Sequence, residues 1–453
     1  MRFRSWMIWI PLFCGALGVR AQTGTATSAT LRVPQVTDAM LAPPKAAELG
    51  IDSWTQALDL IRARSPSYQA SAQAVVAAQG QQRIALAGVL PTLTAQAGIL
   101  HQFNTEMFTL AGTTFESPPP DVWNLGATLS WNIVQPRALY GLGTAQRNVD
   151  AARLSLADTR RQLASNVVAQ LLSTLAAARV AELNRVGLRS ALERLALTEA
   201  RLQYAQGTEL DRDRAKQDVA LARAQLIAGD ESLAQTRESL GALLGSDRPM
   251  SANVQLDLTQ LEDAVAKTCK LNHELEQRPD LQAAKLRLEV AERSVRDAQL
   301  QASPYVNVTS SLAHASATSL SPLTTWSVGA TLWFPLYDGG VRYGVLQQAQ
   351  AQVSLARAAL EDTRLNAVIS SARADRAVSV LTASRDLARE QRDTAQRIDA
   401  RIRDGWAQGI GTSLDLVTSA QSLRNAENAL ALLEFQVAQA RANAVLINAE
   451  CVY

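Results

Sequence analysis

The sequence has few of the residues on which catalytic and metal sites depend. Histidine occurs three times in 453 residues, at the scattered positions His101, His273 and His314. No cysteine or histidine cluster has the spacing of a metal site. We also find no nucleophile motif and no glycine loop of the kind that holds phosphate. An enzyme is therefore not expected, and no metal or other cofactor is implied.

The chain also lacks an excess of charge of either sign. Residues 1–21 are typical of a secretory signal peptide, with Arg2 and Arg4 ahead of an apolar core and a cleavage site at 19–21. Removing the three arginines of this segment leaves 41 basic against 42 acidic residues, a net charge of about −1. This balance argues against a nucleic-acid partner, because nucleic-acid-binding domains concentrate basic residues.

Cysteine is scarce as well, with three copies in the chain. Cys14 lies inside the predicted signal peptide, and the bulky Phe13 before it disfavours lipid attachment. Cleavage leaves Cys269 and Cys451, and an exported protein can join such a pair in a disulfide. We expect instead two buried, unpaired thiols.

Long hydrophobic runs are missing after the signal peptide. The most apolar stretch, 167–178, is interrupted by Gln170, Ser173 and Thr174 and is followed by Arg179. A membrane helix needs roughly 18 or more apolar residues with few charges, so none is expected here. For an exported membrane protein without such a helix, a β-barrel is the remaining way to span a bilayer.

What the chain does contain is an internal duplication. The stretch WSVGATLWFPLYDGGVRYG at 326–344 has an earlier copy, WNLGATLSWNIVQPRALYG, at 123–141. Apolar residues alternate with polar or small ones in each copy, which indicates a β-strand with one apolar face. Such a strand suits either a membrane β-barrel or a hairpin that lies on helices in a soluble protein. Aromatic residues frame each apolar row about 26 Å apart, as in a barrel's aromatic girdles. We assign the girdle to Trp123, Trp131, Trp326 and Phe334.

Prolines bracket the segments 66–91 and 279–304. Because proline suits the first turn of a helix and the start of a strand, each bracket predicts one helix leading into a strand. Each such strand should pair with an aromatic-framed one. A proline-free helical stretch then follows, at about 141–204 and about 344–406, and its apolar spacing suits closely packed coiled coils. A glycine-bearing turn and a returning helix complete each copy.

One repeat is therefore helix, strand, strand, long helix and helix, and the fold class is mainly α with a β-barrel portion. In the first repeat the two strands are joined by a connection with a proline run at 118–120, which we expect to form a stiff, exposed loop. The predicted segments are a signal peptide at 1–21, a flexible leader at 22–50, a first repeat at 51–247, a second repeat at 248–453, and strands at about 92–101, 123–132, 305–313 and 326–335.

This order of elements resembles the TolC family of outer-membrane efflux proteins over nearly everything after residue 50. The motifs that carry the likeness are RPDLQAA at 278–284, WFPLYDGG at 333–340, and the turns AQGTELD at 205–211 and GIGTSLD at 409–415. The resemblance implies a homotrimer whose chains each give four strands to one shared twelve-stranded barrel in outer-membrane lipid. It also implies a periplasmic α-helical tunnel beneath the barrel, and two partners: a periplasmic adaptor protein and an inner-membrane pump.

In the family, the tip of the second repeat carries an aromatic residue, an arginine and two aspartates that constrict the tunnel. By resemblance, Trp406 takes the aromatic position and Asp415 that of the first aspartate. Gly411 stands where the arginine would be, and Thr418 where the second aspartate would be. Asp211 matches the acidic position in the tip of the first repeat. These departures leave one acidic ring and no arginine lock.

The predicted acidic ring has a simple physical basis. Threefold symmetry would bring three copies of Asp415 near one axis, where like charges raise one another's pKa and attract cations. An aspartate just after a helix-joining turn also serves as an N-terminal cap, so both interpretations stay open for Asp415 and Asp211. We expect a passive exit duct of a tripartite efflux or type I secretion system, carrying small molecules or proteins. A periplasmic coiled-coil adaptor or tether is the alternative.

Overall fold

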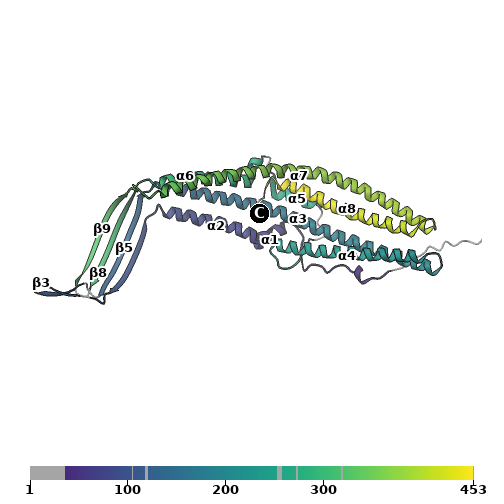
Figure 1. Cartoon of the computed structure of the whole chain (residues 1–453), viewed down its shortest axis with the longest axis horizontal. Helices are drawn as coiled ribbons and strands as arrows, with labels where there is room; N and C mark the ends of the chain where they lie inside the picture. The colour runs from purple at the N-terminus through teal and green to yellow at the C-terminus, as the bar shows by residue number, and fades with distance from the viewer. Residues whose placement is uncertain are drawn as a thin grey trace, which may run out of the picture.

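The molecule is long and bent, with a sheet of strands at one end and long helices extending from it (Figure 1). The computed structural model describes residues 36–104, 106–117, 121–252, 258–271, 274–317 and 320–451. The predicted signal peptide lies outside the described residues. Helices make up most of the described chain, in agreement with the predicted mainly α class.

The sheet contains the four strands that the duplication predicts. β2 (Thr92–His101) pairs with β5 (Asp121–Val134), β5 with β8 (Tyr305–Ala317), and β8 with β9 (Leu320–Trp333), all antiparallel. Three strands are longer than predicted, and β9 ends before Phe334. In the order β2-β5-β8-β9, the edge strands β2 and β9 have one strand partner each among the described residues.

The register of the sheet separates an apolar from a polar face. Ala127 in the middle of β5 lies opposite Leu312 of β8, whereas the next residue, Thr128, belongs to the other face, where threonine, serine, asparagine and glycine predominate. Trp333 interrupts that polar face. Its ring stacks with that of Tyr305 on β8, with ring centroids 6.3 Å apart. An aromatic pair therefore occupies the helix-proximal end of the polar face.

The connection between β2 and β5 is a second, smaller hairpin. β3 (Glu106–Leu110) pairs with β4 (Thr113–Ser117), and both residues of its turn, Ala111 and Gly112, have positive φ. The sequence did not predict this hairpin, in which residues 106–117 satisfy their backbone hydrogen bonds with one another. The proline run at 118–120 lies outside the described residues.

The proline brackets form the helices that lead into the sheet. α2 (Pro66–Ala87) and α6 (Pro279–Leu300) both begin at proline. Proline has no backbone N–H, but an N–H in the first helical turn would have no partner within the helix, so nothing is lost there. A short helix, α1 (Trp54–Arg64), precedes α2, and the 3₁₀ turn η2 (Leu275–Gln277) precedes α6.

Two long helices run the length of the helical part. α3 (Pro136–Gln203) has 68 residues and α7 (Val341–Ala407) has 67, so each is about 100 Å long. α4 (Glu209–Leu243) returns along α3, and α8 (Ser413–Leu446) returns along α7. α3 therefore has α2 and α4 on one side and α6 and α8 on the other, and it lies at the centre of the helical layer (Figure 1).

α7 lies at the edge of this layer, where it packs mainly against α6 and α8. Its buried residues are correspondingly few and small: Ala349, Ala367, Ala374, Ala388, Ala395 and Asp399. Among the residues that the structure describes, one side of α7 is thus left without a helical partner.

α3 contains a stretch apolar enough, by length and composition alone, to cross a membrane. Half of that stretch is buried inside the protein. Core residues Leu171, Leu172 and Leu188 are at most 1% exposed. The apolar character of α3 is accounted for by its central position among four helices, as for a core helix of any large protein.

A belt of short elements packs on the middle part of the helical layer, against α3, α4 and α8. β1 (Leu49–Ile51) pairs in parallel with β6 (Met250–Ala252), and β7 (Cys269–Leu271) pairs antiparallel with β10 (Ala449–Cys451). Helix α5 (Leu258–Thr268) joins them. The belt contributes to the largest apolar core, which includes Ile51, Trp54, Leu58, Ile61, Leu171, Leu240, Val265 and Leu446.

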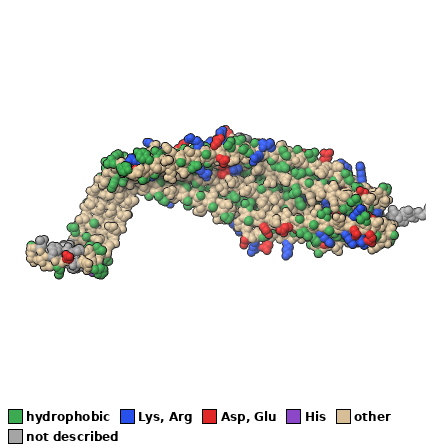
Figure 2. All heavy atoms as spheres, in the orientation of Figure 1, with side chains coloured by type: hydrophobic (Ala, Val, Ile, Leu, Met, Phe, Trp, Pro, Cys, Tyr) green, Lys and Arg blue, Asp and Glu red, His purple; other side chains and the backbone are tan. Residues whose placement is uncertain are grey.

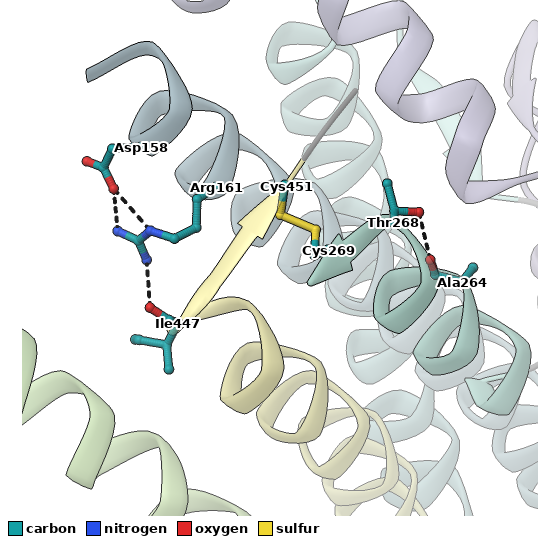
Figure 3. The surroundings of a disulfide bond; sticks show 7 residues. All are labelled: Asp158, Arg161, Ala264, Thr268, Cys269, Ile447 and Cys451. Carbon is teal, nitrogen blue, oxygen red and sulfur yellow. Dashed lines mark hydrogen bonds and ion pairs between the residues drawn. A yellow bond between two sulfur atoms is a disulfide. The ribbon is translucent and has the colours of Figure 1, made fainter. Parts of the chain in front are cut away.

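The prediction of two unpaired thiols is wrong. Cys269 and Cys451 form a disulfide in the belt, as Figure 3 shows. They are direct partners in the β7–β10 ladder, which brings their Cα atoms to 4.1 Å from each other. The two residues are 182 positions apart in sequence, and only the tertiary pairing of two three-residue strands joins them.

The described part of the leader is fixed on the first hairpin, that is, on α3 and α4. Asp38 caps the 3₁₀ turn η1 (Ala39–Leu41) and forms an ion pair with Arg223 of α4 at 2.7 Å. Arg185 donates to the carbonyl of Ala42 at 3.3 Å, and Arg237 to that of Lys45 at 2.9 Å. Residues 36–48 therefore run along the helices as an extended segment.

Candidate functional site

The predicted constriction residues lie at the tips of the two helical hairpins, at the end of the molecule far from the sheet (Figure 1). Both tips fold by the same motif. Thr208 and Thr412 are the N-caps of α4 and α8, and each forms a reciprocal pair of hydrogen bonds with the aspartate three residues later. These capping boxes satisfy backbone N–H groups that a helix start leaves free.

Asp211 and Asp415 are therefore the third helical residues (N3) of these capping boxes, and their carboxylates accept from the N-cap threonines. The Asp415 N–H donates to Thr412 Oγ1 at 3.1 Å, and the Thr412 N–H donates to Asp415 Oδ2 at 3.3 Å. Asp415 remains exposed, as does Thr418, whose hydroxyl donates to the carbonyl of Leu414 at 2.8 Å. Both aspartates thus take part in helix capping, although the N-cap residue itself is threonine, and a role of Asp415 or Asp211 in a pore stays a prediction.

A hydroxyl joins the two tips. Ser413 at the start of α8 donates a hydrogen bond to Asp211 Oδ1 of α4, and Arg214 donates to the Ser413 oxygen at 3.5 Å. The Ser413 hydroxyl lowers the pKa of Asp211 below its ordinary value; partial burial raises it, and hydrogen bonds from Thr208 lower it further. Asp211 thus stays ionised while it bridges the hairpins.

Arg201 makes a second contact between the tips. Its guanidinium lies over the indole of Trp406, 3.7 Å from the ring centroid, and donates to the Trp406 carbonyl at 3.0 Å. A cation over the face of tryptophan is a favourable arrangement worth about 0.5–2 kcal/mol. Gly411 packs against the backbone of the same tryptophan, because a Cβ at position 411 would be 3.4 Å from the backbone nitrogen of Trp406.

A buried ion triad lies about three helical turns from the tips. Asp218 of α4 is 1% exposed and accepts hydrogen bonds from Arg194 of α3 and Arg424 of α8, each at 2.6 Å. Gln421 donates to the same carboxylate at 3.4 Å. One carboxylate thus joins three helices and two hairpins. We call Arg194, Asp218 and Arg424 the hairpin clasp.

The clasp depends on a glycine. A Cβ on Gly187 of α3 would lie 2.6 Å from the Arg424 Cδ, so a side chain there would displace the arginine. Burial by itself raises the pKa of Asp218, but the guanidiniums of Arg194 and Arg424 outweigh it and hold that pKa below its ordinary value. Asp218 is therefore a carboxylate at neutral pH, although it is almost inaccessible to water.

Further polar contacts hold α8 in the same region. Asp399 of α7 is fully buried, accepts from Ser419 of α8 at 3.0 Å, and pairs with Arg403. Closer to the belt, Asn428 of α8 donates to Asn184 of α3 at 3.1 Å. The second hairpin, α7 and α8, is thus attached to the first by polar side chains rather than by apolar packing alone.

The predicted girdle residues lie at the other end of the molecule. Trp123, Trp131 and Trp326 are on the apolar face of the sheet and are 59%, 43% and 75% exposed. Phe334 follows directly after β9 and is 58% exposed. Their placement at a membrane interface stays a prediction.

Sequence reasoning missed the hairpin clasp, although the sequence carries a signal for it. Asp218 falls on the stripe Ala215, Val219 and Ala222 of α4, and Arg424 falls in line with Leu416 and Ala420 of α8. A charge within a buried stripe is expected only where a partner neutralises it. Among the residues that the structure describes, no group of three or more His, Cys, Asp or Glu side chains is placed to hold a metal ion.

Comparison with known proteins agrees with this architecture. A sequence profile of the outer membrane efflux protein family matches residues 57–246 and 271–446. The chain is 23% identical to the probable outer membrane lipoprotein SilC of Salmonella typhimurium, over 76% of this chain and 74% of that protein. It is 26% identical to the pyoverdine export outer membrane protein OpmQ of Pseudomonas putida, over 66% of this chain and 64% of that protein. The CmeC outer membrane channel of Campylobacter jejuni has the same fold, with a TM-score of 0.75 at 14% identity, covering 92% and 93% of the two chains.

The architecture of two similar helical hairpins that lead into one sheet with a single apolar face is that of outer-membrane channel proteins. The chain belongs to the outer membrane efflux protein family. The predicted family, the location in the cell outer membrane and the role in efflux are thereby confirmed.

Proposed function

We propose that three copies of this chain enclose a passive exit duct, with a twelve-stranded barrel at its outer-membrane end. The sheet supports this proposal because the four paired strands carry one Asp, Glu, Lys or Arg residue, Asp121 at the far end of β5. On the face seen in Figure 2, charged side chains lie mostly over the helices and rarely over the strands. The two sheet edges, β2 and β9, would join neighbouring copies, since lipid cannot satisfy an open edge.

The helical layer supports the same closure by a second and third copy. The side of α7 that has no helical partner in the described part of the chain exposes Leu355, Leu365, Val368, Leu387 and Ile398. At the opposite edge of the layer, α2 and α4 expose Val76, Ile84, Leu221 and Ile227. Packing α7 of one copy against α2 and α4 of the next buries both apolar sets and forms a tunnel wall.

The gate of this duct lies at the hairpin tips. The proposed constriction consists of Asp415, Asp211, Trp406, Thr418 and Gly411. The hairpin clasp and the Arg201–Trp406 contact keep α7 and α8 against α3 and α4, which corresponds to the closed state. Opening requires that the second hairpin move away from the first. The free energy needed to break these polar contacts therefore determines how readily the duct opens.

The partners are a periplasmic adaptor protein and an inner-membrane pump. The tips expose apolar side chains next to charged ones, with Tyr204 at 77% and Ile410 at 80% exposure. Such residues suit an adaptor that binds the tips end-on. The pump supplies the energy and selects the substrate, whether small molecules or proteins, and the duct conducts what the pump delivers.

Channel recording tests the proposal directly. Protein purified in detergent should run as a trimer and conduct ions across a planar lipid bilayer. A periplasmic tether, the alternative function, would be released from membranes by carbonate washing and would conduct nothing. A carbonate-soluble, non-conducting protein would therefore overturn the proposed duct.

Asp415→Asn should weaken block of the channel by divalent cations about tenfold, the factor that corresponds to a loss of about 1.4 kcal/mol of attraction. The amide keeps an oxygen for the cap with Thr412, so the stability of α8 should change little. Asp415→Ala should also lose the hydrogen bonds that the Asp415 carboxylate accepts from Thr412, at a cost of about 1 kcal/mol, while Thr412 still caps the backbone N–H of residue 415. Bilayer recordings and thermal unfolding separate the two effects.

Asp362→Asn is the matched control, because Asp362 is exposed on α7 far from the tips. It should leave cation block unchanged. Equal block in wild-type and Asp415→Asn channels would remove Asp415 from the constriction.

A further inference from the structure

The disulfide of the belt lies in a place that solvent cannot reach. Cys269 and Cys451 are each 1% exposed and belong to the largest apolar core. Val265 and Leu446 are fully buried in the same core. An enzyme or a soluble oxidant therefore has no access to either sulfur once the core has formed.

The elements that this bond joins are too small to stay in place alone. The β7–β10 ladder has three residue pairs, and α5 has 11 residues. Isolated hairpins and helices of this size are marginal in water. The disulfide bond attaches the ladder and α5 to the end of α8. Arg161 of α3 holds the same end of α8: its guanidinium pairs with Asp158 and donates to the Ile447 carbonyl at 3.3 Å (Figure 3).

We propose that Cys269 and Cys451 are the substrate of an exported thiol oxidoreductase of the dithiol–disulfide class. The reaction precedes closure of the belt core and joins β7, at the end of α5, covalently to β10. A chain bound for the outer membrane crosses a compartment in which disulfides form, so the oxidant is at hand. The inference concerns assembly of the belt and does not depend on the trimeric duct.

The chemistry balances within this pair of proteins. One cysteine thiolate attacks the disulfide of the oxidoreductase, which forms a mixed disulfide and releases one enzyme thiol. The second thiolate of the chain then attacks the mixed disulfide and releases the other enzyme thiol. The chain loses two electrons and two protons, and the enzyme disulfide becomes a dithiol. The cysteines are 182 positions apart in sequence, so the whole segment between them must be exported before the second step.

The first test compares hosts with and without the exported oxidoreductase. Peptide mass spectrometry after alkylation, without reduction, should find Cys269 and Cys451 linked in the complete host. In the deficient host both should carry the alkyl label, and supplying cystine in the medium should restore the linked form. Free thiols in protein from the complete host would overturn the proposal, as would equal linkage in both hosts.

The second test asks what the bond does. The double variant Cys269→Ala/Cys451→Ala should unfold about 5–10 °C below wild type, because a disulfide that closes a long loop restricts the unfolded chain strongly. Limited proteolysis should then cut the variant in the belt and leave α3 and α7 intact. Circular dichroism and proteolysis need neither trimer nor conductance, so a failure here is distinct from a failure of the proposed duct.

Val265→Ala is the matched control, because it removes buried volume from the same core and keeps both cysteines. It should lower the unfolding temperature in both hosts and still form the linked peptide in the complete host. The double variant should behave identically in the two hosts. Wild-type stability that does not differ between the hosts would overturn the role of the bond in fixing the belt.

Discussion

Asp218→Ala is expected to lower the free energy of unfolding by about 3–5 kcal/mol, the usual cost of removing one partner from a buried ion pair. The substitution leaves the guanidiniums of Arg194 and Arg424 facing each other across a site that is almost closed to water. Their repulsion should push α8 away from α3 and α4. Denaturant unfolding of the detergent-solubilised protein measures the change in stability, and bilayer recording should show a larger open fraction.

Asp213→Ala provides the control for this prediction. Asp213 lies on the same helix, but its side chain is 65% exposed and 3.6 Å from Arg212. Surface pairs of this kind contribute about 0–1 kcal/mol. Similar losses of stability in the two variants would contradict a special role for the hairpin clasp.

The stabilising effect of Asp218 should also depend on pH. The folded-state pKa of Asp218 lies below the ordinary value of 3.8. Its contribution is therefore complete above about pH 3.8 and is lost as the pH falls through the lower folded-state pKa. The stability difference between wild type and Asp218→Ala should shrink in strong acid and stay constant near neutrality.

Ala127→Arg is expected to prevent insertion into the outer membrane, whereas Thr128→Arg is expected to be tolerated. The two residues are neighbours in the middle of β5, but Ala127 lies on the apolar face and Thr128 on the polar face. An arginine on the lipid face of a barrel costs about 2–4 kcal/mol at the bilayer midplane. If three chains share the barrel, each inserted trimer carries that cost three times.

Membrane fractionation measures the outcome. Ala127→Arg should be lost from the detergent-extracted outer membrane and appear in the soluble or degraded fraction. Thr128→Arg should remain in the membrane and change the ion selectivity of the channel toward anions. Insertion of both variants to the same extent would contradict the assignment of the apolar face to lipid.

The duplication made much of the fold predictable. Two aromatic-framed strands, two proline brackets and two glycine-bearing turns each recur once, and together they predict the order of helices and strands. Alternation also predicts which face of β5 is apolar. These signals are local, because period and turn chemistry act over a few residues.

The parts that could not be predicted depend on contacts between distant segments. The pairing of Cys269 with Cys451 is decided by two three-residue strands, for which no pattern exists at that length. The hairpin clasp joins residues from three helices, and neither Asp218 nor Arg424 has a counterpart in the other repeat. Capping, by contrast, is local, which is why the cap role of Asp211 and Asp415 was anticipated from the turns.

The two repeats meet at the centre of the sheet, where β5 of the first repeat pairs with β8 of the second over 12 residue pairs. Each half on its own is a two-stranded ribbon with both edges open. A protein with a single repeat would need twice as many copies to close a barrel of the same number of strands. Because both hairpins belong to one chain, their sequences need not be the same, and Asp218 of the first hairpin can pair with Arg424 of the second.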